Sequence, residues 1–344
     1  MKELVEKLFS SNTLTRNEIE MLLGNLNTEI EDYLFTKARL LTDKVFGRNI
    51  YIRGLLEFTN HCYRNCLYCG IRKNNTNVLR YRFYEDEILN ICEKANVLGF
   101  KTFVLQGGED PFYNDDKMEE LVYRIRKLYP DIAITLSIGE RDEAIYRRLK
   151  LSGANRFLLR HETINRSQYN SFHPGMSYDE RIKCIKTLKK LGYQTGVGFL
   201  IGLPGQKLTD YVDDLMFIKD LNPEMVGIGP FIPHKDTPLN YFRRGSVKTT
   251  LVMLSIIRLL LPKALIPSST ALNTLSYDGC YSGFDAGANV LMLNITPAKE
   301  RENYSLYEGK AEVDVVNSIN LQELKNQMKN RGYILDMSMG DYKY

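Results

Sequence analysis

The sequence has no hydrophobic run long enough to cross a membrane. Its longest apolar stretch, residues 251–262, is interrupted by Arg258 and ends beside Pro262, whereas a membrane-spanning helix needs roughly 18 or more apolar residues. Residues 1–14 form an amphipathic pattern that contains glutamate, which is unlike a secretory signal or a transit peptide. We therefore expect a soluble, cytoplasmic protein with no membrane partner.

Cysteine is scarce, and basic residues are not clustered. The chain of 344 residues has six cysteines, of which three lie within residues 62–69. So few cysteines do not make a disulfide framework, and in a reducing compartment a close triplet indicates metal ligands. The net charge is +4, and the densest basic run, Lys183–Lys190, alternates with apolar residues at helical spacing. This pattern favours the solvated face of a helix over a nucleic-acid site.

The sequence has no repeats, no low-complexity tracts and no Pro/Ser-rich linkers. Most of it alternates between short apolar segments and amphipathic segments. The first ~45 residues have apolar positions at helical spacing. After them come eight predicted strand–helix units, of which the last has a strand but no assigned helix. The predicted strands are 52–58, 101–106, 132–138, 156–160, 196–202, 225–229, 265–270 and 289–293. The predicted helices are 85–98, 115–128, 140–151, 177–191, 207–220, 247–260 and 277–286.

This alternation predicts an α/β fold with a parallel sheet. Eight units in roughly 250 residues match the size of a (βα)8 TIM barrel. A doubly wound open sheet is the alternative architecture. We predict an N-terminal helical extension over residues 1–48, and a barrel with a C-terminal helical segment over residues 49–344.

Polar or glycine-rich segments follow all eight predicted strands. They read TNHCYRNC, QGGED, SIGE, RHET, GLPGQ, PFIPH, SSTA and NITP. In a barrel the C-terminal ends of the strands lie on one face, and active sites are built there. The sequence therefore predicts a single site on this face.

The cysteine triplet Cys62, Cys66 and Cys69 offers three thiolates in the loop after the first predicted strand. A closed structural zinc site needs four protein ligands. His61 could be the fourth, but it is adjacent to Cys62, so binding one ion with both side chains is strained. Soft thiolates suit zinc and iron–sulfur clusters alike. Three thiolates on a 4Fe–4S cube would leave one iron open to an external molecule.

The C-x3-C-x2-C spacing, with Tyr68 before the last cysteine, resembles that of the radical S-adenosylmethionine (SAM) superfamily. The resemblance implies that the cysteines hold one 4Fe–4S cluster and that SAM occupies the open iron. It also implies reductive cleavage of SAM to methionine and a 5′-deoxyadenosyl radical. Residues 105–111 resemble the Gly-Gly-Glu segment of the family. Residues 198–205 resemble its adenine segment, with departures at Leu200 and Gly205.

Longer segments narrow the resemblance to the HydE family of FeFe-hydrogenase maturases, in the branch that includes biotin synthase and methylornithine synthase. These segments are residues 158–163, 225–239 and 287–297, within a likeness that runs from about 30 to 310. The resemblance implies a role in H-cluster assembly, on a small cysteine-bound Fe(CO)2(CN) precursor of the diiron subcluster. It also implies other hydrogenase maturases as partners and a reductase or ferredoxin as electron donor.

The same resemblance assigns individual residues. SAM would contact Tyr68, Gly107, Gly108, Glu109, Ser137, Glu162, Arg181, Leu200 and Met292. The substrate would contact Arg53, Gln106, Arg160, Ser269, Thr270, Tyr304 and Tyr307. Arg53 and Arg160 lie at strand positions that can face the barrel interior, where a guanidinium suits an anionic group. The alternatives are a strand-end ion pair for Arg160 and Glu162, and core packing for Tyr304 and Tyr307.

Three other functions remain alternatives. Biotin synthase would need cysteines on neighbouring strands, and the strand ends VLQGG, TLSIG and FLIGLPG have none. Methylornithine synthase shares the overall size and the GEDP segment. A non-catalytic iron–sulfur or zinc scaffold is an alternative of a different class. Some HydE relatives carry a second cysteine set near their C-terminus, but residues 306–324 contain no cysteine, so we expect one cluster.

Overall fold

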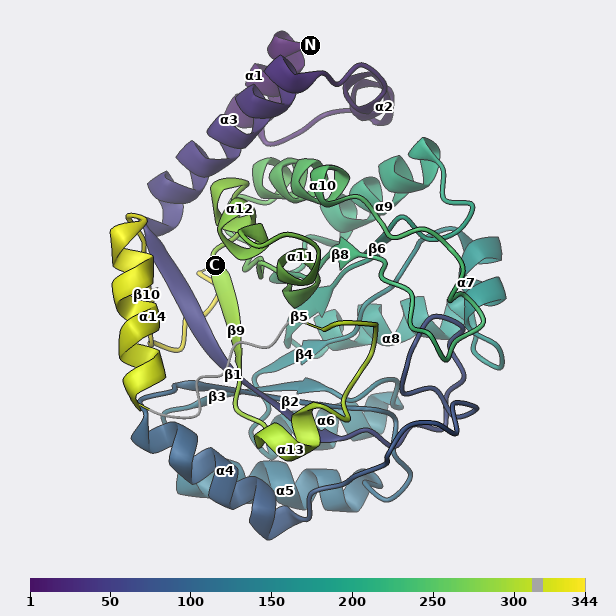
Figure 1. Ribbon diagram of the computed structural model, residues 1–344, viewed down its shortest axis with the longest axis vertical. Helices are drawn as coiled ribbons and strands as arrows, with labels where there is room; N and C mark the ends of the chain where they lie inside the picture. Colours follow the sequence, from purple (N-terminus) through teal and green to yellow (C-terminus); the bar gives the residue numbers. More distant parts are fainter. Residues whose placement is uncertain (311–317, 344) are drawn as a thin grey trace.

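The computed structural model describes residues 1–310 and 318–343 and has parallel strands surrounded by helices (Figure 1). Residues 311–317, part of the segment from which a single cluster is predicted, lie outside the described residues. Among the helices of the described residues, none combines the length and the apolar character needed to span a bilayer.

The barrel strands run parallel to one another and follow chain order around a ring. They are β1 (Asn49–Thr59), β2 (Thr102–Gly107), β3 (Ala133–Ser137), β4 (Arg156–Leu158), β5 (Gln194–Val197), β7 (Met225–Val226) and β9 (Val290–Asn294). Met225 pairs with Leu265, Pro267 pairs with Val290, and β9 pairs with β1. These links return the ring to its start. The barrel is therefore confirmed, and the open sheet is wrong.

Two barrel strands are interrupted where glycines bring backbones close together. The predicted strand 196–202 divides into β5 and β6 (Leu200–Ile201), and β6 pairs with β8 (Gly229–Pro230) instead of continuing the main ladder. A Cβ at Gly198 would lie 1.8 Å from the carbonyl oxygen of Gly227. The two backbones can therefore approach this closely only because residue 198 has no side chain.

Helices pack around the outside of the barrel (Figure 1). They are α4 (Glu85–Val97), α5 (Asp115–Leu128), α6 (Glu143–Leu151), α7 (Arg166–Phe172), α8 (Tyr178–Lys190), α9 (Leu208–Leu221), α10 (Val247–Leu260), α11 (Thr270–Leu275), α12 (Gly279–Asp285) and α13 (Ala298–Arg301). The bounds of α5 and α10 agree with the predicted ranges. Asn114 and Ser246 cap their first turns by accepting backbone N–H groups. Helices α7, α11 and α13 are not among the predicted helices, because each is too short for apolar residues to recur at helical spacing.

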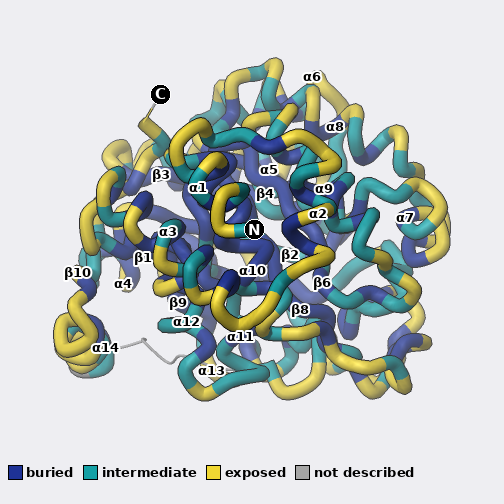
Figure 2. Tube along the Cα trace, turned by 90° about the horizontal axis from the view of Figure 1, so that it is seen from above, coloured by how far each residue is buried: buried dark blue, intermediate teal, exposed yellow. Residues whose placement is uncertain are grey.

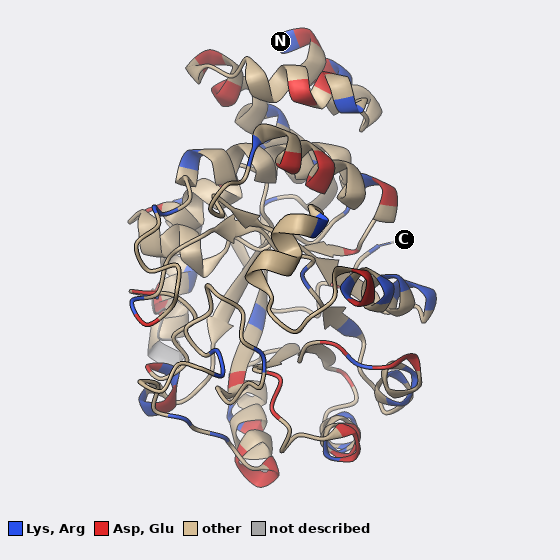
Figure 3. Ribbon diagram, turned by 90° about the vertical axis from the view of Figure 1, so that its right-hand side faces the viewer, with Lys and Arg blue, Asp and Glu red and all other residues tan. Residues whose placement is uncertain are grey.

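The hydrophobic core lies between the strands and the helices. Figure 2 shows the strands buried and the outer turns exposed, and Figure 3 shows charged residues mainly on the surrounding helices and loops. Successive residues of a strand point to opposite faces. Ile52 and Leu56 of β1 join the core, whereas Arg53 and Glu57 belong to the face that lines the barrel interior.

Three helices precede the barrel: α1 (Lys2–Ser11), α2 (Arg16–Gly24) and α3 (Thr28–Phe46). Helix α3 packs on α10, and α2 packs on α9. Val5, Leu8 and Leu34 are fully buried. These helices extend the core of the barrel outward, and the domain boundary at residue 48 stays a prediction.

The C-terminal residues cross the ends of the strands that are opposite to the predicted site. Helix α14 (Ser318–Asn330) leads to β10 (Ile334–Asp336), which pairs with the start of β1. Beyond it, the Arg156 guanidinium donates to the Met339 carbonyl oxygen at 2.7 Å and to Asp341 at 2.6 Å. This segment therefore covers the N-terminal ends of the barrel strands.

Candidate active site

The cysteine triplet lies in the loop between β1 and α4, and all three thiols are free. Burial raises the pKa of the Cys62, Cys66 and Cys69 thiols, to about 12 for Cys66. The neighbouring thiols of the triplet add to the rise in pKa at Cys66 and Cys69. Thiols that resist ionisation in this way become thiolates when a metal centre binds them. Three cysteine thiols in one loop are the donor type that a 4Fe–4S cluster uses, and that these three residues hold it stays a prediction.

Neighbouring loops hold the cysteine loop in place. The Leu67 N–H donates to the carbonyl oxygen of Phe172, at the end of α7, at 2.9 Å. The end of β2 approaches from another side, where a Cβ at Gly108 would lie 2.2 Å from the His61 carbonyl oxygen. Gly108 therefore permits the close contact between β2 and the loop.

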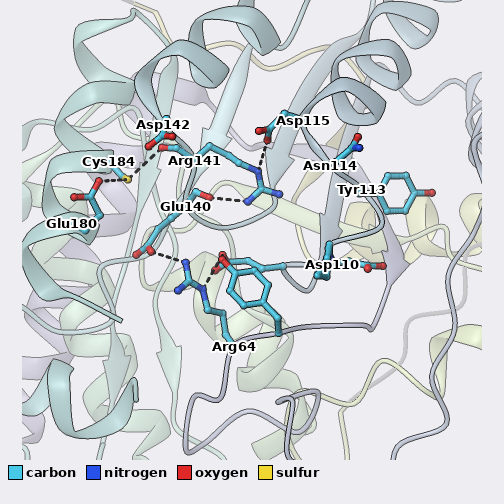
Figure 4. Close-up of a pocket in the computed structure, with 13 residues that line it drawn as sticks. Arg64, Asp110, Tyr113, Asn114, Asp115, Glu140, Arg141, Asp142, Glu180 and Cys184 are labelled. Carbon is cyan, nitrogen blue, oxygen red and sulfur yellow. Dashed lines mark hydrogen bonds and ion pairs between the residues drawn. The ribbon is translucent and has the colours of Figure 1, made fainter. Parts of the chain in front are cut away.

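A network of ion pairs joins the cysteine loop to the loops after β2, β3 and β4. Arg64 pairs with Glu109 and with Glu140, each at 2.9 Å. Glu140 also pairs with Arg181 at 2.7 Å, and Arg181 donates to the Arg160 carbonyl oxygen at 2.7 Å. Figure 4 shows the link between Arg64 and Glu140. The network fixes the orientation of Arg181. It also engages the Glu109 carboxylate, whose role toward the SAM ammonium stays a prediction.

A cavity of about 460 Å³ lies beside this network, and Figure 4 draws residues that line it. Its lining includes Arg64, Glu140, Arg141, Asp115 and Glu180, and is therefore largely charged. The residues predicted to contact the substrate do not line it. This cavity is distinct from the barrel interior.

Several side chains of the predicted substrate chamber carry buried polar atoms without hydrogen-bond partners in the described structure. These atoms are Nε and Nη2 of Arg53, Nε and Nη2 of Arg160, and Oγ of Ser269. Arg53 is 1% exposed, and its Nη1 lies 3.7 Å from the Met225 sulfur. Burying polar groups without partners is costly. Their presence inside the barrel fits a site that a polar ligand completes.

Residues 303–310 form a segment over the C-terminal ends of the strands, which we call the lid. The Lys310 ammonium pairs with the fully buried Glu57 carboxylate and donates to the Tyr304 carbonyl oxygen at 3.1 Å. The Gly70 N–H donates to the Leu306 carbonyl oxygen at 2.8 Å. The lid is therefore fastened both to the barrel wall and to the cysteine loop.

The lid carries two of the predicted substrate residues. The Tyr304 side chain is hydrogen-bonded to Gln106 at the end of β2, and the Tyr307 side chain to Thr274 of α11. Burial raises the pKa of both tyrosines, so they are neutral near pH 7. Ser269 is the N-cap residue of α11, and Thr270 begins that helix.

The residues predicted to contact SAM come from separate strands and loops. Tyr68 and Leu200 belong to one apolar cluster with Phe172. Glu162 adopts a left-handed backbone with φ of 64°, and its Oε2 lies 3.2 Å from Nη2 of Arg160. Among the described residues, neither of these two atoms has a hydrogen-bond partner. The strand-end ion pair is therefore present, but it leaves both groups able to bind a ligand.

The remaining SAM candidates lie on three different parts of the barrel. Ser137 ends β3, and Met292 lies on β9 beside Arg53 of β1. Both are partly buried. Gly107 ends β2, where a Cβ would lie 2.9 Å from the Thr59 side chain.

Comparison with known proteins places this chain in a family. The model of the radical SAM superfamily matches residues 56–218. The chain is 43% identical to the [FeFe] hydrogenase maturase subunit HydE of Thermotoga maritima over 90% of this chain and 88% of that protein. The chain belongs to the HydE family of the radical SAM superfamily. It is therefore a radical SAM enzyme, and its cofactors are a 4Fe–4S cluster and SAM.

Proteins other than HydE are also similar to this chain, in sequence or in fold. The chain is 31% identical to 3-methylornithine synthase of Methanosarcina barkeri, over 89% of this chain and 86% of that protein. The crystal structure of methylornithine synthase PylB has a TM-score of 0.84 at 28% identity and covers 97% of both chains. The hydrogenase maturase HydG has a TM-score of 0.83 at 21% identity, covering 97% of this chain and 75% of that one, and shares the fold.

Three features of this HydE-family site are missed by reasoning from the sequence. They are the Arg64–Glu140 pair, the Glu57–Lys310 pair and His173, which is hydrogen-bonded to Tyr68. Burial lowers the pKa of His173 to about 3, so it is neutral near pH 7. Arg64 and Glu140 lie in segments that the sequence analysis quotes, but in all three cases only the fold shows which side chains are partners.

Proposed function

We propose that this chain acts in the assembly of the diiron subcluster of FeFe-hydrogenase. Its substrate would be a small cysteine-bound Fe(CO)2(CN) precursor. The observation that carries the proposal is the 43% identity to HydE over 90% of the chain. In the described structure, Arg53, Arg160 and Ser269 each bury polar atoms that make no hydrogen bond, and these atoms support a ligand with carboxylate or cyanide groups.

Cys62, Cys66 and Cys69 would hold the cluster, which when bound supplies the electron that cleaves SAM to methionine and a 5′-deoxyadenosyl radical. Arg181 is a suitable partner for the carboxylate of SAM, because Glu140 and the Arg160 carbonyl oxygen already fix its guanidinium. The other SAM contacts would be Tyr68, Gly107, Gly108, Glu109, Ser137, Glu162, Leu200 and Met292.

The substrate would occupy the barrel interior beneath the lid. Arg160 and Arg53 would bind its anionic groups. Gln106, Ser269, Thr270, Tyr304 and Tyr307 would line the chamber. The fully buried Glu57, paired with Lys310, would keep the lid closed and exclude water. A dry chamber strengthens each of these electrostatic contacts.

Partner proteins complete the proposal. A reductase or ferredoxin would reduce the cluster, and another hydrogenase maturase would supply the precursor.

A reconstituted maturation assay tests the proposal. Hydrogenase lacking its diiron subcluster is incubated with the partner maturases, SAM and a reductant, with and without this chain. We expect hydrogenase activity only when the chain is present. Equal activity in its absence would refute the role.

Formation of 3-methylornithine from free amino acids would instead favour the second candidate function. The 31% identity to 3-methylornithine synthase supports that alternative. Mass spectrometry of the reaction with SAM and amino acids distinguishes the two.

A further inference from the structure

The hydroxyl group of Tyr68 is held by a histidine from a distant part of the chain. Tyr68 directly precedes Cys69, and its hydroxyl oxygen lies 2.8 Å from Nε2 of His173. His173 follows α7 and is 2% exposed. The other ring nitrogen, Nδ1, lies 2.7 Å from the Tyr169 carbonyl oxygen. Both nitrogens of this buried ring therefore have one defined partner each.

These contacts fix the direction of the Tyr68 hydrogen bond. A carbonyl oxygen only accepts, so Nδ1 of His173 must carry the proton that it donates to Tyr169. In a neutral imidazole the other nitrogen is then an acceptor. Nε2 therefore accepts the proton of the Tyr68 hydroxyl. The tautomer follows from the chemistry of the two partners.

The His173 ring is itself fixed in place. It stacks on the Tyr169 ring with centroids 4.1 Å apart and an interplanar angle of 20°. One residue earlier, the Phe172 carbonyl oxygen accepts the Leu67 N–H at 2.9 Å. The end of α7 thus holds the turn between Cys66 and Cys69 at two points, one on the backbone and one on the Tyr68 side chain.

We propose that His173 is a positioning residue that orients Tyr68 toward SAM. Without the hydrogen bond at its outer end, the Tyr68 ring could rotate among the apolar side chains of Leu200 and Phe172 that surround it. Fixing the ring in advance lowers the cost of ordering it when SAM binds. The inference rests on the proposed contact between Tyr68 and SAM and is independent of the hydrogenase substrate.

The test is a double-mutant cycle on SAM affinity. Anaerobic calorimetry measures the Kd for SAM with the cluster-loaded protein and its Tyr68→Phe, His173→Phe and doubly substituted variants. A neutral hydrogen bond corresponds to about a fivefold change in affinity. We expect about fivefold weaker binding in each single variant and no further loss in the double variant. His173→Gln keeps an acceptor for the hydroxyl and should restore most of the affinity.

Arg166→Lys is the matched control, because it changes an exposed side chain of the same helix, α7, whose pair with Asp179 contributes little. It should bind SAM as the wild type does. Iron content and the EPR spectrum of the reduced cluster without SAM are measured for every variant. Additive losses of about 25-fold in the double variant would overturn the proposal. So would single variants with unchanged affinity, or loss of iron in His173→Phe. Hydrogenase maturation does not enter these readouts, so the proposed substrate can fail separately.

Discussion

Replacing Arg160 by lysine separates binding of the substrate from cleavage of SAM. Arg160 follows β4, its side chain is 29% exposed, and its Nε and Nη2 atoms are buried without hydrogen-bond partners in the described structure. A buried hydrogen bond to a charged group contributes about 1.5–3 kcal/mol, which is roughly ten- to hundredfold in affinity. Lysine keeps the charge but loses the planar fork. Arg160→Lys should therefore lower hydrogenase maturation at least about tenfold.

The same variant should cleave SAM without substrate at a rate within a few-fold of wild type, measured as 5′-deoxyadenosine released after reduction with dithionite. Arg166→Lys is the control, since Arg166 forms an exposed pair with Asp179 and such pairs contribute little. Normal maturation by Arg160→Lys would refute the assignment to the substrate chamber. Loss of the cluster or of folding would show that Arg160 is a structural partner of Glu162.

Three further predictions concern the cluster and the lid. Reconstituted protein should contain about four irons and four sulfides per chain, and Cys66→Ala should lose nearly all of them; about eight irons would indicate a second cluster. Replacing Cys62, Cys66 and Cys69 together should abolish 5′-deoxyadenosine formation, and residual product would contradict the mechanism. Lys310→Met leaves the buried Glu57 without its cation, which costs about 3–5 kcal/mol. Hydrogen exchange of residues 303–310 should then be at least about a hundredfold faster, and unchanged exchange would show that the pair does not fasten the lid.

The sequence predicts the features that depend on neighbouring residues. Helices α5 and α10 have the predicted bounds because an apolar period and an N-cap residue are both local signals. The eight strand–helix units predict the barrel for the same reason. The cysteine triplet is also a local signal, because its three thiols lie within eight residues of one loop.

The sequence is less informative where strands are short or interrupted. Residues 265–267 close the ring by isolated bridges instead of a regular strand. The breaks in the strands near Gly198 and Gly227 depend on how closely two backbones approach. Strand β10 is only three residues long, and its pairing with β1 supplies its stability. None of these features produces a recurring pattern of apolar residues that could be recognised in the sequence.

The amino-acid sequence by itself thus determined the barrel and the superfamily, because each depends on residue type and spacing along the chain, and it predicts the cysteine triplet as the cluster ligands. Only the tertiary structure decided which side chains meet. Lys310 pairs with Glu57 across 253 positions, and His173 reaches Tyr68 across 105. Arg64 pairs with Glu109 across 45 positions. Such contacts arise when separate loops converge at the ends of the strands, and convergence in space leaves no pattern in the order of the residues.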